Sequence, residues 1–154
     1  MAYKMYLVLL VMASILFNSC TGLGDNQVAK GQERMKRNIY QFGKMIQCET
    51  KRWPTDYLGY GCWCGLGGKG TPVDETDQCC KEHDLCYKKA HRTDCFIGQA
   101  YTVVYNRKGC SGCDEKKNKK YEQTVCECDS VAVKCFKKAK FNDKYKRYSQ
   151  TKCH

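Results

Sequence analysis

The sequence has few histidines, no apolar run of membrane-spanning length, and fewer acidic than basic residues. It contains three histidines, and its closely spaced cysteines occur as CxC at 62–64 and as CC at 79–80, so a zinc-binding fold is not predicted. The apolar run from Tyr6 to Phe17 is too short to cross a bilayer. With 154 residues, the chain is too short for two well-buried cores, which predicts one domain.

Cysteine and positive charge are both in excess. The chain has 14 cysteines, which predict a disulfide scaffold formed in an oxidising compartment. Its 27 Lys and Arg exceed its 16 Asp and Glu, for a net charge of +11. Such a surplus attracts polyanions. Because export is also predicted, we expect an anionic lipid surface or a heparin-like sulfated glycan as the partner, and no nucleic acid.

The N-terminal residues predict export and processing. Lys4 and the apolar run that follows it are typical of a signal peptide, which we place at residues 1–20, with cleavage after Cys20, Gly22 or Gly24. Residues 25–37 are polar, have no apolar period and end in Lys36-Arg37, so residues 21–37 are interpreted as a propeptide. The predicted domain is residues 38–154, and the predicted location is extracellular.

The central motif, CWCGLGGKGTPVDETDQCCKEHDLCY at residues 62–87, joins a glycine-rich loop to a predicted helix. Glycines allow the loop to curl so that its carbonyl oxygens turn inward. Carbonyl oxygens with a carboxylate suit a hard cation, above all calcium. The motif resembles secreted phospholipase A2, and the resemblance covers most of residues 38–154. Cys48 favours the pancreatic and elapid-venom type of groups I and II, whereas the C-terminal KFNDKYKRYSQTKC is also similar to the inflammatory type.

The predicted fold is mainly α and disulfide-rich. A short helix is predicted to begin at Asn38, and its apolar stripe is formed by Ile39, Phe42 and Ile46. Two long helices are predicted over residues 74–91, capped by Asp74, and over residues 121–138. The second has an apolar face of Val125, Cys128, Ala132, Cys135 and Phe136. Between them, AYTVVY at residues 100–105 predicts one strand of a small β-hairpin.

Cysteines spaced seven apart on both long helices permit an antiparallel clamp. The family resemblance selects this geometry and implies the pairs Cys48–Cys110, Cys62–Cys153, Cys64–Cys80, Cys79–Cys135, Cys86–Cys128 and Cys113–Cys126. Cys95 is left without its usual family partner. Its bond is absent, or the neighbouring pairs are rearranged, or Cys95 bonds a partner chain.

The resemblance also implies the chemistry, which is calcium-dependent hydrolysis of the sn-2 ester of glycerophospholipids at membrane surfaces. His83 matches the general base, and Asp129 matches the carboxylate that orients its imidazole. Calcium (Ca2+) is expected to bind the Asp84 carboxylate and three main-chain carbonyls, those of Trp63, Gly65 and Gly67. The Gly65 amide is expected to stabilise the oxyanion. Tyr87 matches a tyrosine bonded to the catalytic aspartate, and the second such tyrosine is Tyr101 or Tyr105.

Other interpretations stay open. The same scaffold also serves toxins and receptor- or partner-binding modules, for which hydrolysis is incidental, and polyanion binding without catalysis is a third class. The basic clusters at 116–120 and 134–152 suit either a solvated face or an anionic membrane. Trp53, beside two cations, suits either a membrane interface or partial burial in the fold.

Overall fold

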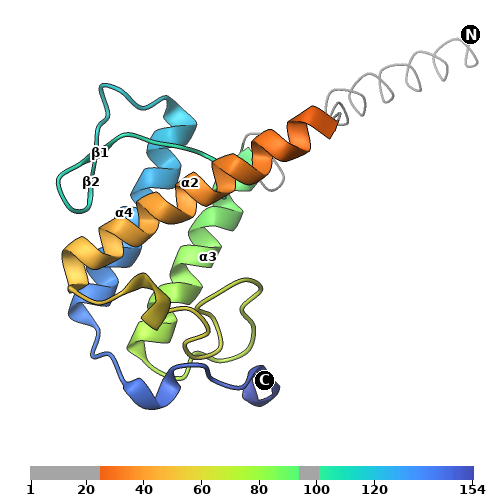
Figure 1. The fold of residues 1–154 in the computed structure, drawn as a ribbon. Coiled ribbons are helices and arrows are strands. Elements are labelled where there is room, and N and C mark those ends of the chain that lie inside the picture. The colour runs from red at the N-terminus through yellow and green to blue at the C-terminus, as the bar shows by residue number, and fades with distance from the viewer. Residues whose placement is uncertain (1–24, 94–100) are drawn as a thin grey trace, which may run out of the picture.

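The structure is a computed structural model that describes residues 25–93 and 101–154. Figure 1 shows that helices dominate this part of the chain, which confirms the mainly α prediction. The long helices are α2 (Asp25–Thr50), α3 (Glu75–Thr93) and α4 (Lys120–Lys138). Short 3-10 helices lie at Pro54–Asp56, Asp143–Tyr145 and Gln150–Lys152, and a two-stranded hairpin is formed by β1 (Arg107–Lys108) and β2 (Gly112–Cys113).

Helix α3 begins where the sequence predicts, because Asp74 caps it. The Asp74 Oδ1 atom accepts a hydrogen bond from the Asp77 amide at 2.9 Å, and its main-chain carbonyl accepts one from the Gln78 amide at 2.9 Å. These bonds satisfy amides that the first turn of a helix leaves without partners. The cap therefore sets the phase of every later residue on α3, including the predicted site residues.

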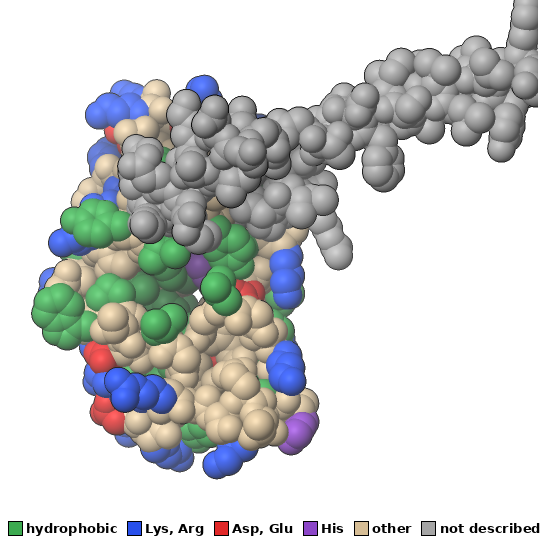
Figure 2. Space-filling view, turned by 45° about the vertical axis from the view of Figure 1, so that its right-hand side comes forward, with side chains coloured by type: hydrophobic (Ala, Val, Ile, Leu, Met, Phe, Trp, Pro, Cys, Tyr) green, Lys and Arg blue, Asp and Glu red, His purple; other side chains and the backbone are tan. Residues whose placement is uncertain are grey.

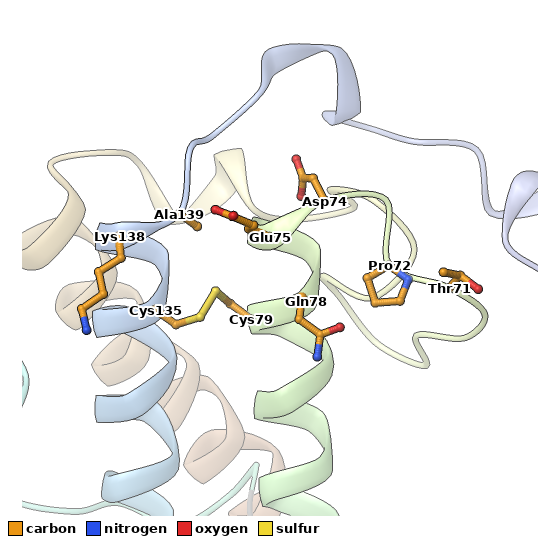
Figure 3. Close-up of a pocket in the computed structure, with 9 residues that line it drawn as sticks. All are labelled: Thr71, Pro72, Asp74, Glu75, Gln78, Cys79, Cys135, Lys138 and Ala139. Carbon is orange, nitrogen blue, oxygen red and sulfur yellow. A yellow bond between two sulfur atoms is a disulfide. The ribbon is translucent and has the colours of Figure 1, made fainter.

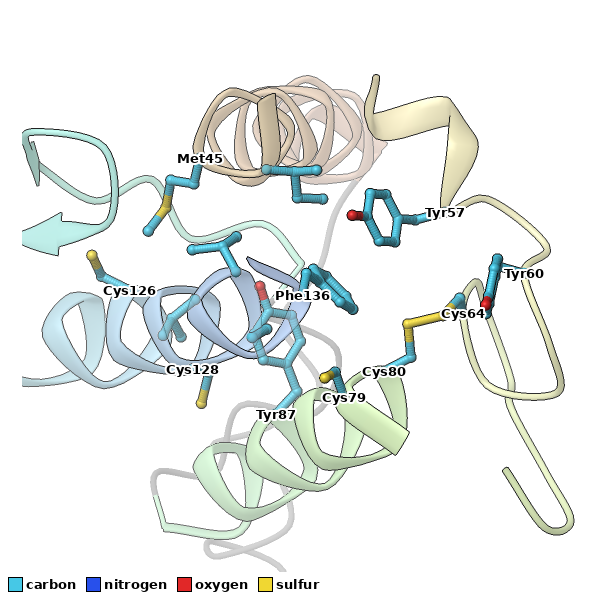
Figure 4. Close-up of a cluster of buried hydrophobic side chains, with 14 of the residues drawn as sticks. Met45, Tyr57, Tyr60, Cys64, Cys79, Cys80, Tyr87, Cys126, Cys128 and Phe136 are labelled. Carbon is cyan, nitrogen blue, oxygen red and sulfur yellow. A yellow bond between two sulfur atoms is a disulfide. The ribbon is translucent and has the colours of Figure 1, made fainter. Parts of the chain in front are cut away.

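Helix α4 provides most of one wall of the core. Its buried residues are Val125, Cys126, Cys128, Asp129, Ser130, Ala132, Val133 and Phe136, which include most of the predicted apolar face. Figure 4 shows Met45 from α2, Tyr87 from α3 and Phe136 from α4 directed into the same interior. The single polar group that reaches the middle of this layer as a carboxylate is Asp129, among the buried residues of α4. The core therefore surrounds a charged group that needs dedicated partners.

Six disulfides connect the described elements, and all six predicted pairs are confirmed. Two of them join α3 to α4 in antiparallel orientation, and the others attach the loops and the C-terminal segment. The pairs are Cys48–Cys110, Cys62–Cys153, Cys64–Cys80, Cys79–Cys135, Cys86–Cys128 and Cys113–Cys126. Cys20 and Cys95 lie outside the described residues, so the prediction for Cys95 stays a prediction.

Helix α2 differs from the prediction at its start. A short helix was predicted to begin at Asn38, whereas the structure has one continuous helix from Asp25 to Thr50. The residues before Asn38 lack an apolar period, but they include Gln, Lys, Glu, Arg and Ala, which favour helix in water. Once the packed part of α2 is formed, extending it adds one hydrogen bond per residue at low cost.

The predicted strand AYTVVY is wrong, and the hairpin lies directly after it. Strands β1 and β2 pair antiparallel, with Arg107 opposite Cys113. The described part of the predicted strand bonds to side chains of α2 instead. Asn38 Nδ2 donates to the Val103 carbonyl at 2.7 Å, and Gln41 donates to the Tyr105 carbonyl. Because these backbone groups already have side-chain partners, the segment does not need a neighbouring strand.

The described helices were also compared with what a bilayer requires. Within residues 25–93 and 101–154, no helix combines the length and the apolar character that crossing a membrane needs.

Candidate active site

The centre of the predicted site is the carboxylate of Asp129, which is completely buried. His83 Nε2 lies 2.7 Å from its Oδ1 atom, and the Tyr87 hydroxyl donates to the same oxygen at 2.7 Å. The Tyr105 hydroxyl donates to the second oxygen, Oδ2. Three donors from three different segments therefore converge on one carboxylate, which compensates for the cost of burying its charge.

Tyr105, and not Tyr101, makes the second tyrosine contact with Asp129. Burial, and then the charge of Asp129, raises the pKa of both Tyr87 and Tyr105, so both hydroxyls remain protonated donors. Tyr101 instead packs edge-on against the Tyr87 ring, with a centroid distance of 5.3 Å. The sequence left these two tyrosines as equal candidates because the spacing of this region departs from the family pattern.

The imidazole of His83 is held on two sides. Phe42 of α2 stacks on it with ring centroids 4.6 Å apart and an interplanar angle of 13°. The Nε2 atom faces Asp129, and 12% of the side chain is exposed. Because a buried carboxylate accepts the Nε2 proton, the neutral ring keeps its lone pair on Nδ1. This arrangement orients a base and leaves it partly accessible from outside.

The glycine-rich loop is fixed from below by Asp77, which sequence analysis did not single out. Its buried carboxylate accepts hydrogen bonds from the amides of Cys62 at 2.8 Å, Trp63 at 2.7 Å and Val73 at 3.0 Å. Gly61 makes this approach feasible, because a Cβ there would lie 2.3 Å from the Asp77 Cγ atom. The signal that could have identified Asp77 is its place in the first turn of α3, where a carboxylate can reach free amides.

The backbone of the loop has the conformation that inward-turned carbonyls require. Gly65 and Gly67 have φ values of +142° and +79°, which side chains rarely tolerate. The Trp63 indole donates from Nε1 to the Gly70 carbonyl at 3.0 Å, so the tryptophan closes the loop across its width. The loop is thus held by a carboxylate at one side and an indole at the other.

Asp84 fits a cation ligand. Its carboxylate is half-buried on α3, and among the described residues no hydrogen bond or ion pair satisfies it. Burial raises the pKa of this carboxyl, while the nearby His83 and Lys88 lower it. A carboxylate in this situation is stabilised by a bound cation.

The residues present suit calcium better than a transition metal. Among the described residues, no three side chains of His, Cys, Asp or Glu form a cluster that could hold a metal ion. The expected ligand set includes only one such side chain, Asp84, and takes its other oxygens from the main chain of Trp63, Gly65 and Gly67. Such oxygen ligands match a hard cation, whereas zinc favours nitrogen and sulfur.

An apolar rim surrounds the approach to this region. Figure 2 shows hydrophobic side chains gathered around a hollow that has a histidine at its back. Large apolar side chains that are exposed in the described structure include Ile39, Tyr40, Trp53, Leu58, Leu66, Leu85, Val104 and Val131. Apolar groups at this density on a surface mark a region that meets another apolar phase or a partner.

A second hollow lies between the beginning of α3 and the end of α4, as Figure 3 shows, with the disulfide Cys79–Cys135 at its base. It is lined by Thr71, Pro72, Asp74, Glu75, Gln78, Cys79, Cys135, Lys138 and Ala139. Neither His83 nor Asp129 is among these residues, so this hollow is separate from the predicted site.

Comparison with known proteins identifies the family. A family model described as phospholipase A2 matches residues 39–146. A "Phospholipase A2" of Calliactis polypus is 46% identical over 148 residues, which cover 93% of this chain and 87% of that protein. "Phospholipase A2 A2-hormotoxin-Apt1a" of Adamsia palliata is 43% identical over 121 residues, covering 77% of this chain and 78% of that protein. "Phospholipase A2 A2-actitoxin-Cgg2a" of Condylactis gigantea is 43% identical over 118 residues, covering 75% and 99%.

These matches extend over most of the chain and include the loop, both disulfide-linked helices and the buried carboxylate. The chain therefore belongs to the phospholipase A2 family, and it is an esterase that acts on phospholipid membranes.

Proposed function

We propose that the protein is a secreted, calcium-dependent enzyme that hydrolyses the sn-2 ester of glycerophospholipids, with His83 as general base and Asp129 as the residue that orients it. The observation that carries the proposal is the 2.7 Å contact between His83 Nε2 and Asp129 Oδ1 inside a carboxylate network that excludes water. Six disulfides support secretion, because such bonds persist in oxidising compartments.

In the proposed reaction, Nδ1 of His83 takes a proton from a water molecule whose oxygen attacks the sn-2 carbonyl carbon. Asp129 stabilises the imidazolium that results, and it stays ionised throughout. The tetrahedral intermediate then expels the glycerol oxygen, which receives the proton from His83. The products are a fatty acid and a lysophospholipid, and the protein forms no covalent bond with either.

Asp84 and the carbonyls of Trp63, Gly65 and Gly67 would hold calcium beside this base. Calcium supplies positive charge that binds the substrate phosphate and stabilises the oxyanion. The Gly65 amide is proposed as a second donor to the oxyanion. The half-buried Asp84 carboxylate, which has no partner among the described residues, supports this ligand set.

The experiment is fatty acid release from anionic phospholipid vesicles by the protein cleaved after Arg37, with calcium and with excess chelator. Release that stops with chelator, and that is lost in Asp84→Asn and His83→Gln, is the expected result. Glu82→Gln is the matched control, because it removes the same charge at an exposed position of α3. Release that survives in chelator or in His83→Gln would overturn the proposed mechanism.

We also propose that the preferred surface is anionic, because the net charge is +11 and each well-placed cation contributes about 1 kcal/mol at such a membrane. Heparin-like polyanions would bind by the same attraction. Vesicles that differ only in their fraction of anionic lipid test this preference, and equal adsorption to neutral and anionic vesicles would contradict it. Retention on heparin that falls with salt and is unaffected by His83→Gln would separate polyanion binding from catalysis.

A second proposal concerns a partner chain. Two of the similar proteins have toxin names, and six disulfides account for 12 of the 14 cysteines, so Cys95 is the cysteine of residues 38–154 that they leave over. A disulfide-linked heteromer on a non-reducing gel would support a partner-binding role through Cys95. A monomer with one titratable thiol would contradict it.

A further inference from the structure

Asn38 is a buried polar side chain that the proposed reaction does not use. It is only 2% exposed, although it lies on α2 beside exposed residues Ile39 and Tyr40. A buried carboxamide is costly unless its donors and its acceptor are hydrogen-bonded. Its partners therefore indicate what it does.

The partners of Asn38 belong to the catalytic network. Its Nδ2 atom donates to the Val103 carbonyl at 2.7 Å, and its side chain also hydrogen-bonds the Tyr87 hydroxyl. The single proton of that hydroxyl is already donated to Asp129. The tyrosine oxygen must then accept from Asn38, and the two hydrogens of an amide nitrogen suffice for both bonds.

We propose that Asn38 is a positioning residue for the reaction, which acts on Asp129 through Tyr87 and through the segment that carries Tyr105. A donor to the Tyr87 oxygen polarises the hydroxyl and strengthens its bond to the carboxylate. The bond to Val103 fixes the chain two residues before Tyr105, whose own backbone is held by Gln41. One side chain of α2 thus restrains both tyrosines that hold Asp129.

This inference rests on the proposed function of His83 and Asp129, and it makes a separate prediction. Asn38 does not reach the substrate in the proposed reaction, so its loss is expected to lower kcat and leave KM unchanged. Residues that orient a catalytic group through hydrogen bonds commonly change activity about 10-fold or more when removed. Because Asn38 acts through Tyr87, its effect is expected to shrink when the Tyr87 hydroxyl is absent.

The test is a double-mutant cycle with Asn38→Ala, Tyr87→Phe and the double variant, in the protein cleaved after Arg37. Hydrolysis of a soluble short-chain phospholipid below its micelle concentration, at saturating calcium, separates kcat from membrane adsorption. We expect Asn38→Ala to lower kcat about 10-fold alone. In the Tyr87→Phe background, we expect it to lower kcat less than about twofold. An equal fold-loss in both backgrounds would overturn the proposal.

Two further variants keep the result interpretable. Asn38→Asp preserves size and removes the amide donor, so it tests the same contact if the alanine variant does not fold, and a normal kcat in it would overturn the proposal. Gln47→Ala removes an amide elsewhere on α2 and is expected to leave kcat unchanged; a loss of kcat equal to that of Asn38→Ala would show a general effect of α2 and overturn the proposal. Activity that survives His83→Gln would instead count against the proposed function itself.

Discussion

The imidazole of His83 and the carboxylate of Asp129 meet at 2.7 Å although they are 46 residues apart. The disulfide Cys86–Cys128 joins the residue three positions after His83 to the residue directly before Asp129. A covalent bond this close to both residues fixes the register of α3 against α4. The geometry of the proposed base therefore depends on the helix pair more than on the loops around it.

Replacement of Asp129 by Asn is predicted to lower kcat about 10³- to 10⁴-fold, because an amide no longer selects the tautomer with its lone pair on Nδ1. Glu127→Gln, at an exposed position on the same helix, removes the same charge and is expected to retain full activity. The measurement is hydrolysis of a soluble phospholipid, with circular dichroism as the check on folding. Near-normal turnover in folded Asp129→Asn would exclude the orienting role.

Tyr105→Phe is predicted to reduce the free energy of unfolding by about 1–3 kcal/mol, because it removes a buried donor to a charged acceptor. The exposed Tyr40 provides the control, since Tyr40→Phe removes a hydroxyl from the surface and should cost less than about 0.5 kcal/mol. Guanidinium-induced unfolding measures both. Equal stability of the two variants would mean that the Tyr105 hydroxyl contributes nothing beyond its ring.

Asp77→Asn is predicted to weaken calcium binding about 10-fold or more, because residues that orient metal ligands affect affinity on this scale. An amide cannot accept from all three main-chain donors, so the Trp63 backbone loses part of its restraint. Titration calorimetry with calcium measures this without reference to activity. Asp74→Asn is the control, because it also alters the start of α3 without contacting the loop amides; an equal loss of affinity there would attribute the effect to capping.

The stability of the fold is predicted to depend on pH through Glu49. Hydrogen bonds from Ser111 and Lys137 lower the pKa of this carboxyl below its ordinary value of 4.5. A lowered folded pKa means that the contribution is complete above the unfolded pKa and is lost as the pH falls through the folded one.

The measurement is Tm between pH 7 and pH 2 for the native chain and for Glu49→Gln. The native chain should have the higher Tm at pH 7, and the difference should shrink below pH 4.5. Glu115→Gln, at an exposed position, controls for net charge. A Tm difference that is constant across this range would show that ionisation of Glu49 does not contribute.

The parts of the fold that sequence predicted are those in which one local signal is enough. Asp74 caps α3 through its own backbone neighbourhood, and the matching cysteine spacings, with the family resemblance, select the helix pair. The loop could also be predicted, because glycine at 65 and 67 allows the positive φ that inward carbonyls need. Each of these signals is contained within a few residues.

The parts that sequence did not predict depend on contacts between distant residues. AYTVVY has strand propensity, but Asn38 and Gln41, about 65 residues away, bond its backbone instead. The choice of Tyr105 over Tyr101 follows from the same contacts and has no local signal. The start of α2 was also misplaced, because a polar helix without an apolar stripe gives no periodicity from which to predict it.

Trp53 is predicted to contribute to membrane adsorption and not to chemistry. The structure decides between the two interpretations of this residue, since 67% of the side chain is exposed. Trp53→Ala is expected to weaken binding to phospholipid vesicles about 10-fold, because partial transfer of an indole from water is worth about 1.4 kcal/mol. Hydrolysis of a soluble short-chain substrate should be unchanged.

Val131→Ala is the matched control, because it shortens another exposed apolar side chain, on α4. If Trp53 lies on the membrane-binding face, only its own replacement weakens sedimentation with vesicles. A loss of soluble-substrate hydrolysis in Trp53→Ala would mean that the indole supports the fold, and normal vesicle binding would mean that it only meets water. Because adsorption and turnover are measured separately, the exposed rim and the buried carboxylate network can be assigned independent roles.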